Sequence, residues 1–514
     1  MSTDIGSILV WWGTIFVIGI LGLPLIIVLF HKFWDKGYIF SKIFSLIIVT
    51  YVILVLGIFK ILPFTLVSLS ILIFLFLVFN LFFLLNKQNL DKVVKSFKEN
   101  YKIFIFQELL FLILLVSWSL LRGFAPNIEG LEKYMDWGFI NSSLRSKFLP
   151  PQDMWFAGST INYYYFGHLV FSLITKLSGI PSAITYNLSI ATVFSITFLS
   201  SFSLSSNIVF LLFKKINFQK IILAGLISSL LLTFGGNLHS VYKIIKLNLS
   251  QNNNHLNLSQ QPLAKSIDSY WYPDATRFIG HDPDTKDKTI HEFPIYSFVV
   301  ADLHGHMNDI PVVIFFLATL LVLTVSLSPK INWFSDLFLG FILSVCYMTN
   351  AWDFAVYGLF FAVLTILLNF QRDGPISLIK SIINGGLVII FWYLFSLPFS
   401  INFIPMMEGI RLSDSHTPFY QLFVLYGGFW LISLPFFLYF LIKQPKNHSS
   451  YFIFSLILVA TILVLIPEIL YIKDIYIYEY RRANTMFKLV YQAFILYSIA
   501  SGCILIYISK LLKS

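Results

Sequence analysis

The chain has 514 residues, of which 57% are hydrophobic and 12% are charged, whereas roughly a quarter of the residues in a typical soluble protein are charged. This composition excludes a water-soluble globular protein and predicts an all-α polytopic membrane protein. The net charge of +10 does not indicate nucleic-acid binding, because the Lys residues are dispersed between apolar stretches. Cys346 and Cys503 lie inside apolar stretches, so neither a disulfide between loops nor cysteine chemistry is expected.

The chain contains thirteen apolar stretches that we predict to be membrane-spanning helices, which need about 20 residues each. They cover residues 7–30, 38–60, 63–86, 102–122, 183–213, 220–237, 309–328, 334–349, 354–370, 379–398, 419–442, 451–470 and 486–508. The first stretch has no basic segment before it and no cleavage signal after it, so we expect it to be retained as a span.

A further apolar stretch, Tyr164 to Ser178, is too short to cross the hydrocarbon core as a helix. If it lies at the membrane surface, the loops on the side of the membrane that holds the C-terminal tail carry, together with that tail, 18 of the 35 Lys and Arg residues. Because basic loops are retained in the cytoplasm, we predict thirteen spans in the cell membrane, with the N-terminus outside and the C-terminus in the cytoplasm.

This topology predicts five segments. They are a four-span region (1–122), a first outer loop with interfacial helices (123–182), two spans (183–237), a second outer loop (238–308) and a seven-span region (309–514). Residues 248–261 are rich in Asn and Gln, a composition typical of a flexible segment.

The first outer loop holds the acids Glu132 and Asp136. If residues 129–141 are helical, these side chains share one face, where they could share a proton, bind a metal ion or act as a base. An ordinary solvated helix is the alternative. The same loop ends in Asn162, a run of three Tyr residues and His168. This pattern suits either an aromatic belt at the membrane surface or contacts to a lipid headgroup or sugar.

The second outer loop ends in His291-Glu292 and in Asp302-Leu-His304-Gly-His306. Asp309 and Pro311 resemble the start of a helix, which predicts that residues 302–306 precede it. If that segment is extended, Asp302, His304 and His306 point to one side, as a metal or phosphate site requires. Acid–base catalysis or hydrogen bonding to a substrate is favoured over binding of zinc or manganese, because the spacing matches no zinc motif.

Three smaller groups place charges at predicted membrane edges. They are Asn350-Ala-Trp352-Asp353, Glu408-Gly-Ile-Arg411 with Asp414 and His416, and Glu479-Tyr-Arg481-Arg482-Ala-Asn484. Charges near hydrocarbon are costly, so these are functional candidates. Mutual ion pairing and snorkelling to the interface are the alternatives.

Several of these groups together resemble a known family. They are Glu132-Lys133-Tyr-Met-Asp136, Phe156-Ala-Gly158 with Asn162-Tyr-Tyr-Tyr-Phe-Gly-His168, Glu292-Phe-Pro294 with Asp302-Leu-His304 and His306, Asn350-Ala-Trp352-Asp353, and Arg482-Ala-Asn484-Thr-Met-Phe-Lys488. The pattern is similar to that of uncharacterised bacterial and archaeal membrane proteins named for a Tyr-Tyr-Tyr motif (Chlor_Arch_YYY type), within the GT-C glycosyltransferase superfamily. The resemblance covers roughly residues 123–500.

The resemblance implies transfer of a sugar, with inversion, from a polyprenyl-phosphate donor in the membrane to a glycan, lipid or protein acceptor at the extracytoplasmic face. It implies Asp136 as the base, with Glu132 as the alternative, and Arg481 or Arg482 as the phosphate clamp, with Lys133 as the alternative. Asp302 is a further catalytic candidate. The remaining expected substrate contacts are Asn162, Tyr163, Tyr164, Tyr165, His168, Glu292, His304, His306, Trp352, Asp353 and Asn484.

No cofactor follows from the sequence itself, although Asp302, His304 and His306 could hold a divalent ion, Mg²⁺ or Mn²⁺. Two other classes remain open. A transporter or lipid flippase would need polar or broken segments at the bilayer midplane, and the chain offers few. A non-catalytic subunit of an envelope assembly would not need these acids, His and Arg residues to converge.

Overall fold

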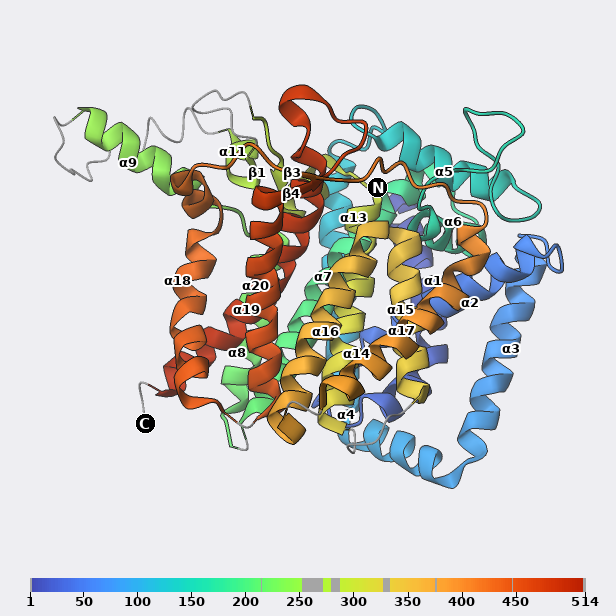
Figure 1. Cartoon of the computed structure of the whole chain (residues 1–514). Helices are drawn as coiled ribbons and strands as arrows, with labels where there is room; N and C mark the ends of the chain where they lie inside the picture. Colours follow the sequence, from blue (N-terminus) through green and yellow to red (C-terminus); the bar gives the residue numbers. More distant parts are fainter. Residues whose placement is uncertain are drawn as a thin grey trace. The chain divides into compact units, whose positions relative to one another are not determined.

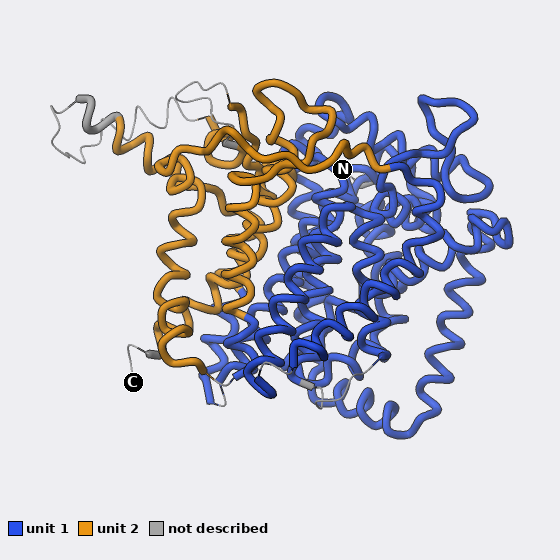
Figure 2. Tube along the Cα trace, viewed as in Figure 1, with its two compact units in different colours: residues 1–225, 300–404, 446–452 blue, residues 226–299, 405–445, 453–514 orange. Residues whose placement is uncertain are grey.

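The computed structural model describes residues 2–213, 215–251, 271–278, 287–326, 333–374, 377–445 and 447–511, most of which are helical (Figure 1). Most of the Asn/Gln-rich segment, residues 252–261, therefore lies outside the described residues. The chain forms two compact units (Figure 2). Unit 1 comprises residues 1–225, 300–404 and 446–452, and unit 2 comprises residues 226–299, 405–445 and 453–514.

Unit 1 is formed by long helices and a few short ones. Its elements are α1 (Ser2–Leu29), α2 (Phe40–Ile58), α3 (Leu66–Leu85), α4 (Lys87–Gly123), α5 (Lys133–Arg145), α6 (Phe166–Ser178), α7 (Ser182–Leu212), α13 (Gly305–Asn308), α14 (Ile310–Ser326), α15 (Trp333–Thr349), α16 (Ala351–Asp373) and α17 (Ser377–Ser400). Helix α7 packs against α4, α5, α6 and α14.

Unit 2 combines helices with short strands. Its elements are α9 (His239–Gln251), α11 (Tyr272–Thr276), β1 (Arg277–Phe278), β2 (His291–Glu292), β3 (Ile410–Leu412), α18 (Phe419–Lys443), β4 (Leu470–Ile472), the 3₁₀ helix η2 (Tyr478–Tyr480) and α20 (Ala483–Leu511). Three helices contain residues of both units: α8 (Phe218–Phe234), α12 (Pro294–Val300) and α19 (His448–Ile469). Strands β1 and β2 pair antiparallel, as do β3 and β4, and α18 and β2 pack against α20.

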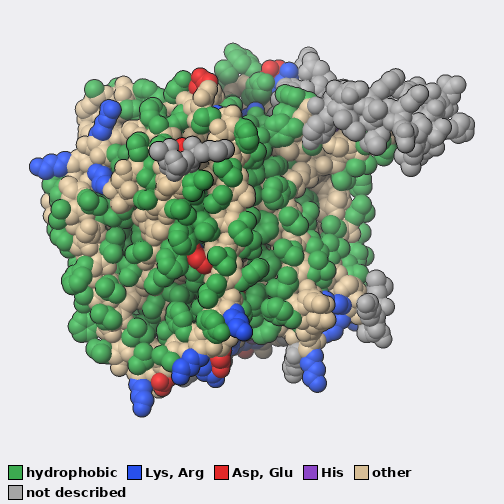
Figure 3. All heavy atoms as spheres, turned by 180° about the vertical axis from the view of Figure 1, so that it is seen from behind, with side chains coloured by type: hydrophobic (Ala, Val, Ile, Leu, Met, Phe, Trp, Pro, Cys, Tyr) green, Lys and Arg blue, Asp and Glu red, His purple; other side chains and the backbone are tan. Residues whose placement is uncertain are grey.

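The prediction of an all-α polytopic membrane protein is confirmed. Among the described residues, eleven helices are long and apolar enough to cross a membrane, and α8 with α9 forms a twelfth candidate that is bent by 71°. Helix α15, the remaining predicted span, has 17 residues. Helix α6 is short, as expected, with 13 residues, and its position at the membrane surface stays a prediction. The face seen in Figure 3 is covered mainly by hydrophobic side chains.

Helix α7 shows how a helix rich in Ser and Thr can be buried along most of its length. The most apolar 18-residue segment of this helix is completely buried, so the hydroxyl groups in that segment cannot bond to water. They donate instead to carbonyls one turn earlier, as Ser189 does to Thr185 O at 2.7 Å and Ser195 to Ala191 O at 2.7 Å. Satisfying polar groups within the helix is what an interior without water requires.

A buried ion pair joins two of the predicted spans. Lys42 lies within α2, is 1% exposed and pairs with Glu108 of α4 at 2.7 Å. Tyr38 Oη donates to the same Glu108 carboxylate at 2.7 Å. A buried ammonium needs a partner of opposite charge, and Glu108 satisfies that need, which also explains an acid inside a predicted span.

Candidate functional site

The site in unit 1 begins with the packing of α5 on α6. Asp136, Phe139 and Ile140 are three or four residues apart, so they share one face of α5. The Phe139 ring lies edge-on to His168, with centroids 5.2 Å apart, and Ser172 of α6 donates to Ile140 O at 3.3 Å. This packing directs Asp136 at His168. Asp136 Oδ1 lies 2.9 Å from His168 Nε2, and both side chains are fully buried.

His304 is the residue around which the acids converge. Its Nδ1 lies 3.0 Å from Glu132 Oε2 and 3.4 Å from Asp136 Oδ1. Its Nε2 lies 2.6 Å from Tyr163 Oη, which donates to Tyr164 Oη at 2.6 Å. The predicted convergence of Glu132 with Asp136 is therefore present, although α5 begins only at Lys133.

Two close contacts hold the segment before α13. Tyr186 of α7 donates its hydroxyl to Ala301 O at 3.0 Å, where Ala301 turns the chain with a φ of 57°. A Cβ on Gly305 would lie 2.5 Å from Thr349 O and 2.6 Å from the Tyr164 ring. Only glycine therefore lets the chain pass this closely beside Tyr164 and α15.

The segment from Asp302 to His306 differs from the extended conformation expected. Helix α14 begins at Ile310, directly after Asp309, as expected, but a short helix, α13, precedes it from Gly305, with His304 at its N-cap position. Because successive helical residues turn by about 100°, His306 does not continue the direction of His304. His306 Nε2 lies 3.9 Å from Asp302 Oδ2. Asp136, Asp302 and His304 instead form a set whose ligand atoms all lie within 4.8 Å of one another.

The cluster strongly favours a charged Asp136. Burial alone would raise the pKa of Asp136, but the hydrogen bonds with His168 and His304 outweigh it and lower the pKa to about 2. Burial also raises the pKa of the Tyr163 phenol far above its usual range. The Tyr163 hydroxyl therefore stays protonated at neutral pH and serves as a hydrogen-bond donor.

Two cations of unit 1 lie near this cluster: Lys133 is close enough to interact with Asp302, and Arg122 is close enough to interact with Lys133. The pKa of Lys133 is lowered overall, because burial and the neighbouring Arg122 outweigh the opposing effect of Asp302. The Arg122 guanidinium bonds to Asn187 Oδ1 at 3.0 and 3.2 Å and to Ala125 O at 2.6 Å. No carboxylate pairs with Arg122 among the residues that the structure describes. Arg122 lines a pocket between the ends of α1, α4 and α7.

Sequence reasoning missed Arg122. Its signal was an Arg in the last turn of a predicted span, directly before the acidic loop. The sequence gives no indication that α7 would offer this Arg an amide, Asn187, in place of a carboxylate.

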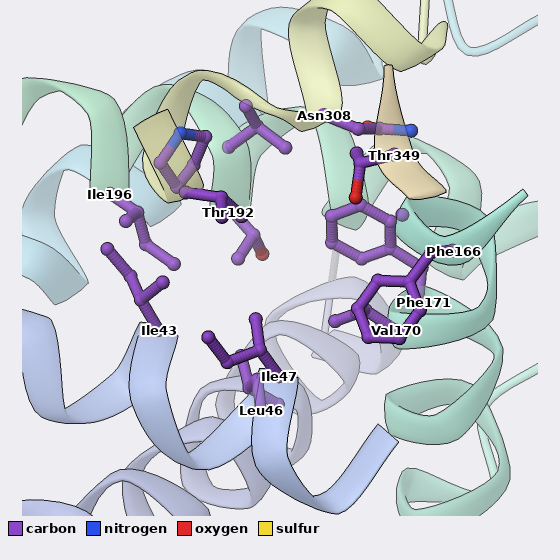
Figure 4. A pocket seen from close by; sticks show the side chains of 14 residues that line it. Ile43, Leu46, Ile47, Phe166, Val170, Phe171, Thr192, Ile196, Asn308 and Thr349 are labelled. Carbon is purple, nitrogen blue, oxygen red and sulfur yellow. The ribbon is translucent and has the colours of Figure 1, made fainter. Parts of the chain in front are cut away.

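An apolar cavity lies among the helices that carry the site (Figure 4). Helices α2, α6 and α7 line it with Ile, Leu, Val and Phe side chains, and Asn308, Pro311, Val312 and Thr349 complete the wall. Phe166 and Gly167 in this wall directly precede His168 in the polar cluster. The wall and the cluster are thus built on the same short helix, α6.

Arg481, Arg482 and Asn484 belong to unit 2, where each has protein partners. The fully buried Arg482 bonds to Asp287 at 2.5 Å, to Glu468 at 2.9 Å and to Thr417 Oγ1 at 3.0 Å. Arg481 pairs with Asp414, and Asn484 donates to Asp474 at 2.5 Å. Mutual ion pairing, one of the two alternatives considered from sequence, describes these Arg residues.

Glu292 and His291 occupy a second buried network of unit 2. Glu292 forms an ion pair with Arg277, with Oε2 3.0 Å from Arg277 Nε, and accepts from Ser297 Oγ at 2.8 Å. Burial raises the pKa of Glu292, and Arg277 opposes the shift. His291 contacts Tyr426 Oη at 2.8 Å and Thr289 Oγ1 at 3.0 Å.

The other predicted residues of unit 1 lie around the cluster. Asn162 exchanges two hydrogen bonds with the backbone of Ile404, at 2.8 and 3.2 Å, so it fixes a loop. Tyr165 is buried against Phe399, and Trp352 is partly buried at the start of α16. Asp353 is fully buried, accepts from Asn350 at 2.8 Å and lies beside Asp309.

Fold and site together define a polytopic helical membrane protein with a buried acid–histidine cluster beside an apolar cavity. The chain belongs to the family described as Uncharacterized membrane protein (DUF2298), whose model matches residues 48–451 and 431–497. No curated protein and no solved structure matches the chain.

Proposed function

We propose that this protein is a membrane-embedded glycosyltransferase of the GT-C type. It would move a sugar from a polyprenyl-phosphate donor to an acceptor hydroxyl at the extracytoplasmic face of the cell membrane. One observation carries the proposal: the convergence of Glu132, Asp136 and His304 beside an apolar cavity lined by α6. A lipid-linked sugar needs polar chemistry and an apolar compartment in one place.

Glu132 is the best candidate for the base. Its side chain is 56% exposed and can meet an acceptor, whereas Asp136 is fully buried. Glu132 would take the proton of the acceptor hydroxyl while the acceptor oxygen bonds to the anomeric carbon. The bond from that carbon to the donor phosphate breaks, and the phosphate leaves with the electron pair. Asp136 is then a positioning residue that acts through His304.

Lys133 and Arg122 are the best candidates to neutralise the departing phosphate. The phosphate gains charge as the sugar leaves, so cations beside it stabilise the transition state. Arg482 is occupied by Asp287 and Glu468, whereas Arg122 bonds only to neutral oxygens in the described part of the chain. A guanidinium can bind phosphate oxygens in a bidentate manner.

The apolar cavity would receive part of the donor's isoprenoid chain. Its wall is hydrocarbon apart from Thr192, Asn308 and Thr349, so an isoprenoid chain would exchange bilayer hydrocarbon for apolar side chains and would gain packing contacts on entry. Val170 and Ile47 face this space (Figure 4), and Val170→Trp should raise KM for the lipid donor more than it lowers kcat.

A transporter or lipid flippase is the second candidate. Buried acids within spans mark ion or proton pathways by default, and Asp309 and Asp353 lie side by side in such a position. A flippase would move the lipid without breaking it, so covalent turnover of the donor separates the two functions.

The direct test supplies purified protein in nanodiscs with polyprenyl-phosphate-linked hexoses and an envelope glycan extract. Release of polyprenyl phosphate is the measured product. We expect release by the wild type and a loss of about 10²-fold or more in Asp136→Asn, which removes the charge that holds His304. Glu129→Gln is the matched control, because Glu129 lies in the same loop and contacts Asn127 instead. No release by the wild type with any donor would contradict the proposal.

A further inference from the structure

We propose that Asp136, Asp302 and His304 bind one divalent metal ion of the Mn²⁺ type. The three residues come from α5 and from the segment before α13, and one ligand atom from each lies within 4.8 Å of the others. The set differs from the one considered from sequence, because Asp136 replaces His306. The binding site stands on its own geometry, but the use of the ion in glycosyl transfer rests on the proposed function.

The hydrogen-bond network assigns the proton on His304. Tyr163 gives its hydroxyl proton to Tyr164, so it can only accept from His304 Nε2. Nε2 therefore carries a hydrogen, and a neutral imidazole then has its lone pair on Nδ1. That lone pair faces the carboxylates of Glu132 and Asp136 at 3.0 and 3.4 Å. Three electron-rich groups this close require a cation between them, either a proton or a metal ion.

Asp136 provides a second, independent observation. Its Oδ2 atom is buried and has no hydrogen-bond partner among the described residues, and the whole side chain is 0% exposed. An unpaired carboxylate oxygen in a dry site is costly. A metal ion bound by both oxygens of the Asp136 carboxylate would satisfy Oδ2, whereas a proton on His304 Nδ1 lies beside Oδ1 alone.

The residues behind the ligands support a metal site. His168 holds Asp136 Oδ1 at 2.9 Å, and Tyr163 holds His304 Nε2 at 2.6 Å. Metal-binding imidazoles and carboxylates are oriented in this way by outer hydrogen bonds. Both ligands would therefore be fixed before the ion arrives.

The composition and exposure of the set indicate the class of ion. Two carboxylates with one imidazole suit Mn²⁺, which favours oxygen ligands and tolerates a nitrogen. The Asp302 side chain is 14% exposed and that of the adjoining Glu132 is 56% exposed, so one side of the site is open. Open coordination positions there would accept phosphate oxygens of the donor.

The test uses the full chain in nanodiscs, stripped of metal by a chelator and titrated with Mn²⁺ alone. The electron paramagnetic resonance signal measures free Mn²⁺, and the difference from the added amount gives the number of bound ions. We expect one ion per wild-type chain, and at least about tenfold weaker binding in Asp302→Asn and in His304→Ala. Glu129→Gln should bind as the wild type does. Spin-echo modulation from an imidazole nitrogen should persist in Asp302→Asn at saturation and vanish in His304→Ala.

Two results would overturn the inference: no saturable Mn²⁺ binding by the wild type, or unchanged binding in a correctly folded Asp302→Asn protein. Asp302 reaches the open side, so its amide variant should keep the wild-type melting temperature even if His304→Ala does not fold. Donor turnover that continues after chelation would overturn the role of the ion in glycosyl transfer and would leave the glycosyltransferase. Mn²⁺ binding without turnover of any lipid-linked sugar would remove the glycosyltransferase and leave the metal site.

Discussion

The charged networks of the two units differ in how completely they are satisfied. In unit 2, Arg482 bonds to two carboxylates, a hydroxyl and the carbonyl of Pro467. In unit 1, two carboxylates converge on the one imidazole of His304, and Asp136 Oδ2 has no partner in the described part of the chain. A closed network stabilises a fold, whereas an unfinished buried network indicates a place for a ligand.

The largest expected effect concerns Glu132. Glu132→Gln keeps the size of the side chain and removes the base, so turnover of a lipid-linked donor should fall about 10²- to 10⁴-fold. Because Glu132 is 56% exposed, the melting temperature should not change. Turnover equal to that of the wild type would assign the base to another acid, with Asp302 next to be tested.

Arg482→Met should mainly affect stability. The substitution leaves the buried Glu468 and the partly buried Asp287 without their cation, which costs about 3–5 kcal/mol. Arg481→Met is the matched control, because Arg481 pairs with the exposed Asp414 and its loss should cost about 0–1 kcal/mol. Thermal unfolding in detergent measures both. A phosphate-binding role for Arg482 would be indicated instead if its variant kept full stability and lost donor binding.

Gly305→Ala tests the close passage beside the site. The new Cβ would meet Thr349 O at 2.5 Å and the Tyr164 ring at 2.6 Å, which should cost about 1–3 kcal/mol and displace His304. Gly358→Ala on α16 has nothing within 4 Å of the new Cβ and should be neutral or slightly stabilising. Equal stability of the two variants would show that the backbone at Gly305 can move to accommodate a Cβ without loss of stability.

The smallest effect is a pH dependence from unit 2. Burial, together with Arg482, lowers the pKa of His291 to about 3, so the folded state holds this residue neutral while the unfolded chain protonates it below about pH 6.5. The unfolded state thus binds more protons, and stability falls as pH falls through 6.5 towards 3. Between pH 7.5 and 5.5 this contribution is about 1 kcal/mol.

His291→Gln isolates that contribution, because Gln keeps hydrogen-bonding capacity towards Tyr426 and Thr289 without titrating. The stability of the variant should therefore decline less on acidification than that of the wild type. Parallel pH profiles of the two proteins would show that His291 can charge within the fold.

Most of the fold could be predicted from hydrophobic stretches alone. Each of the thirteen stretches forms helix, and the short helix α6 matches the stretch at 164–178. The pairing of Lys42 with Glu108, 66 positions later, was not predicted, because hydropathy indicates the spans but not which of their residues meet. Long-range ion pairs of this kind depend on packing that a single sequence does not contain.

The site was predicted in part. Glu132, Asp136, His168, Tyr163 and His304 were all named, and they lie together. The roles of Arg481 and Arg482 were not resolved, because the carboxylates that pair with Arg482 lie 195 and 14 positions before it. The start of α13 at Gly305 was missed because Asp309 and Pro311 give a stronger helix-start signal than His304 does.

The most direct test of the central claim is native mass spectrometry of the purified protein, which identifies the lipid held in unit 1. A bound polyprenyl phosphate or its sugar-linked form is predicted for the wild type. Its occupancy should fall at least about tenfold in the double variant Arg122→Met/Lys133→Met, because the phosphate loses its cations. Absence of any isoprenoid phosphate from the wild type, or equal occupancy in the double variant, would contradict the account.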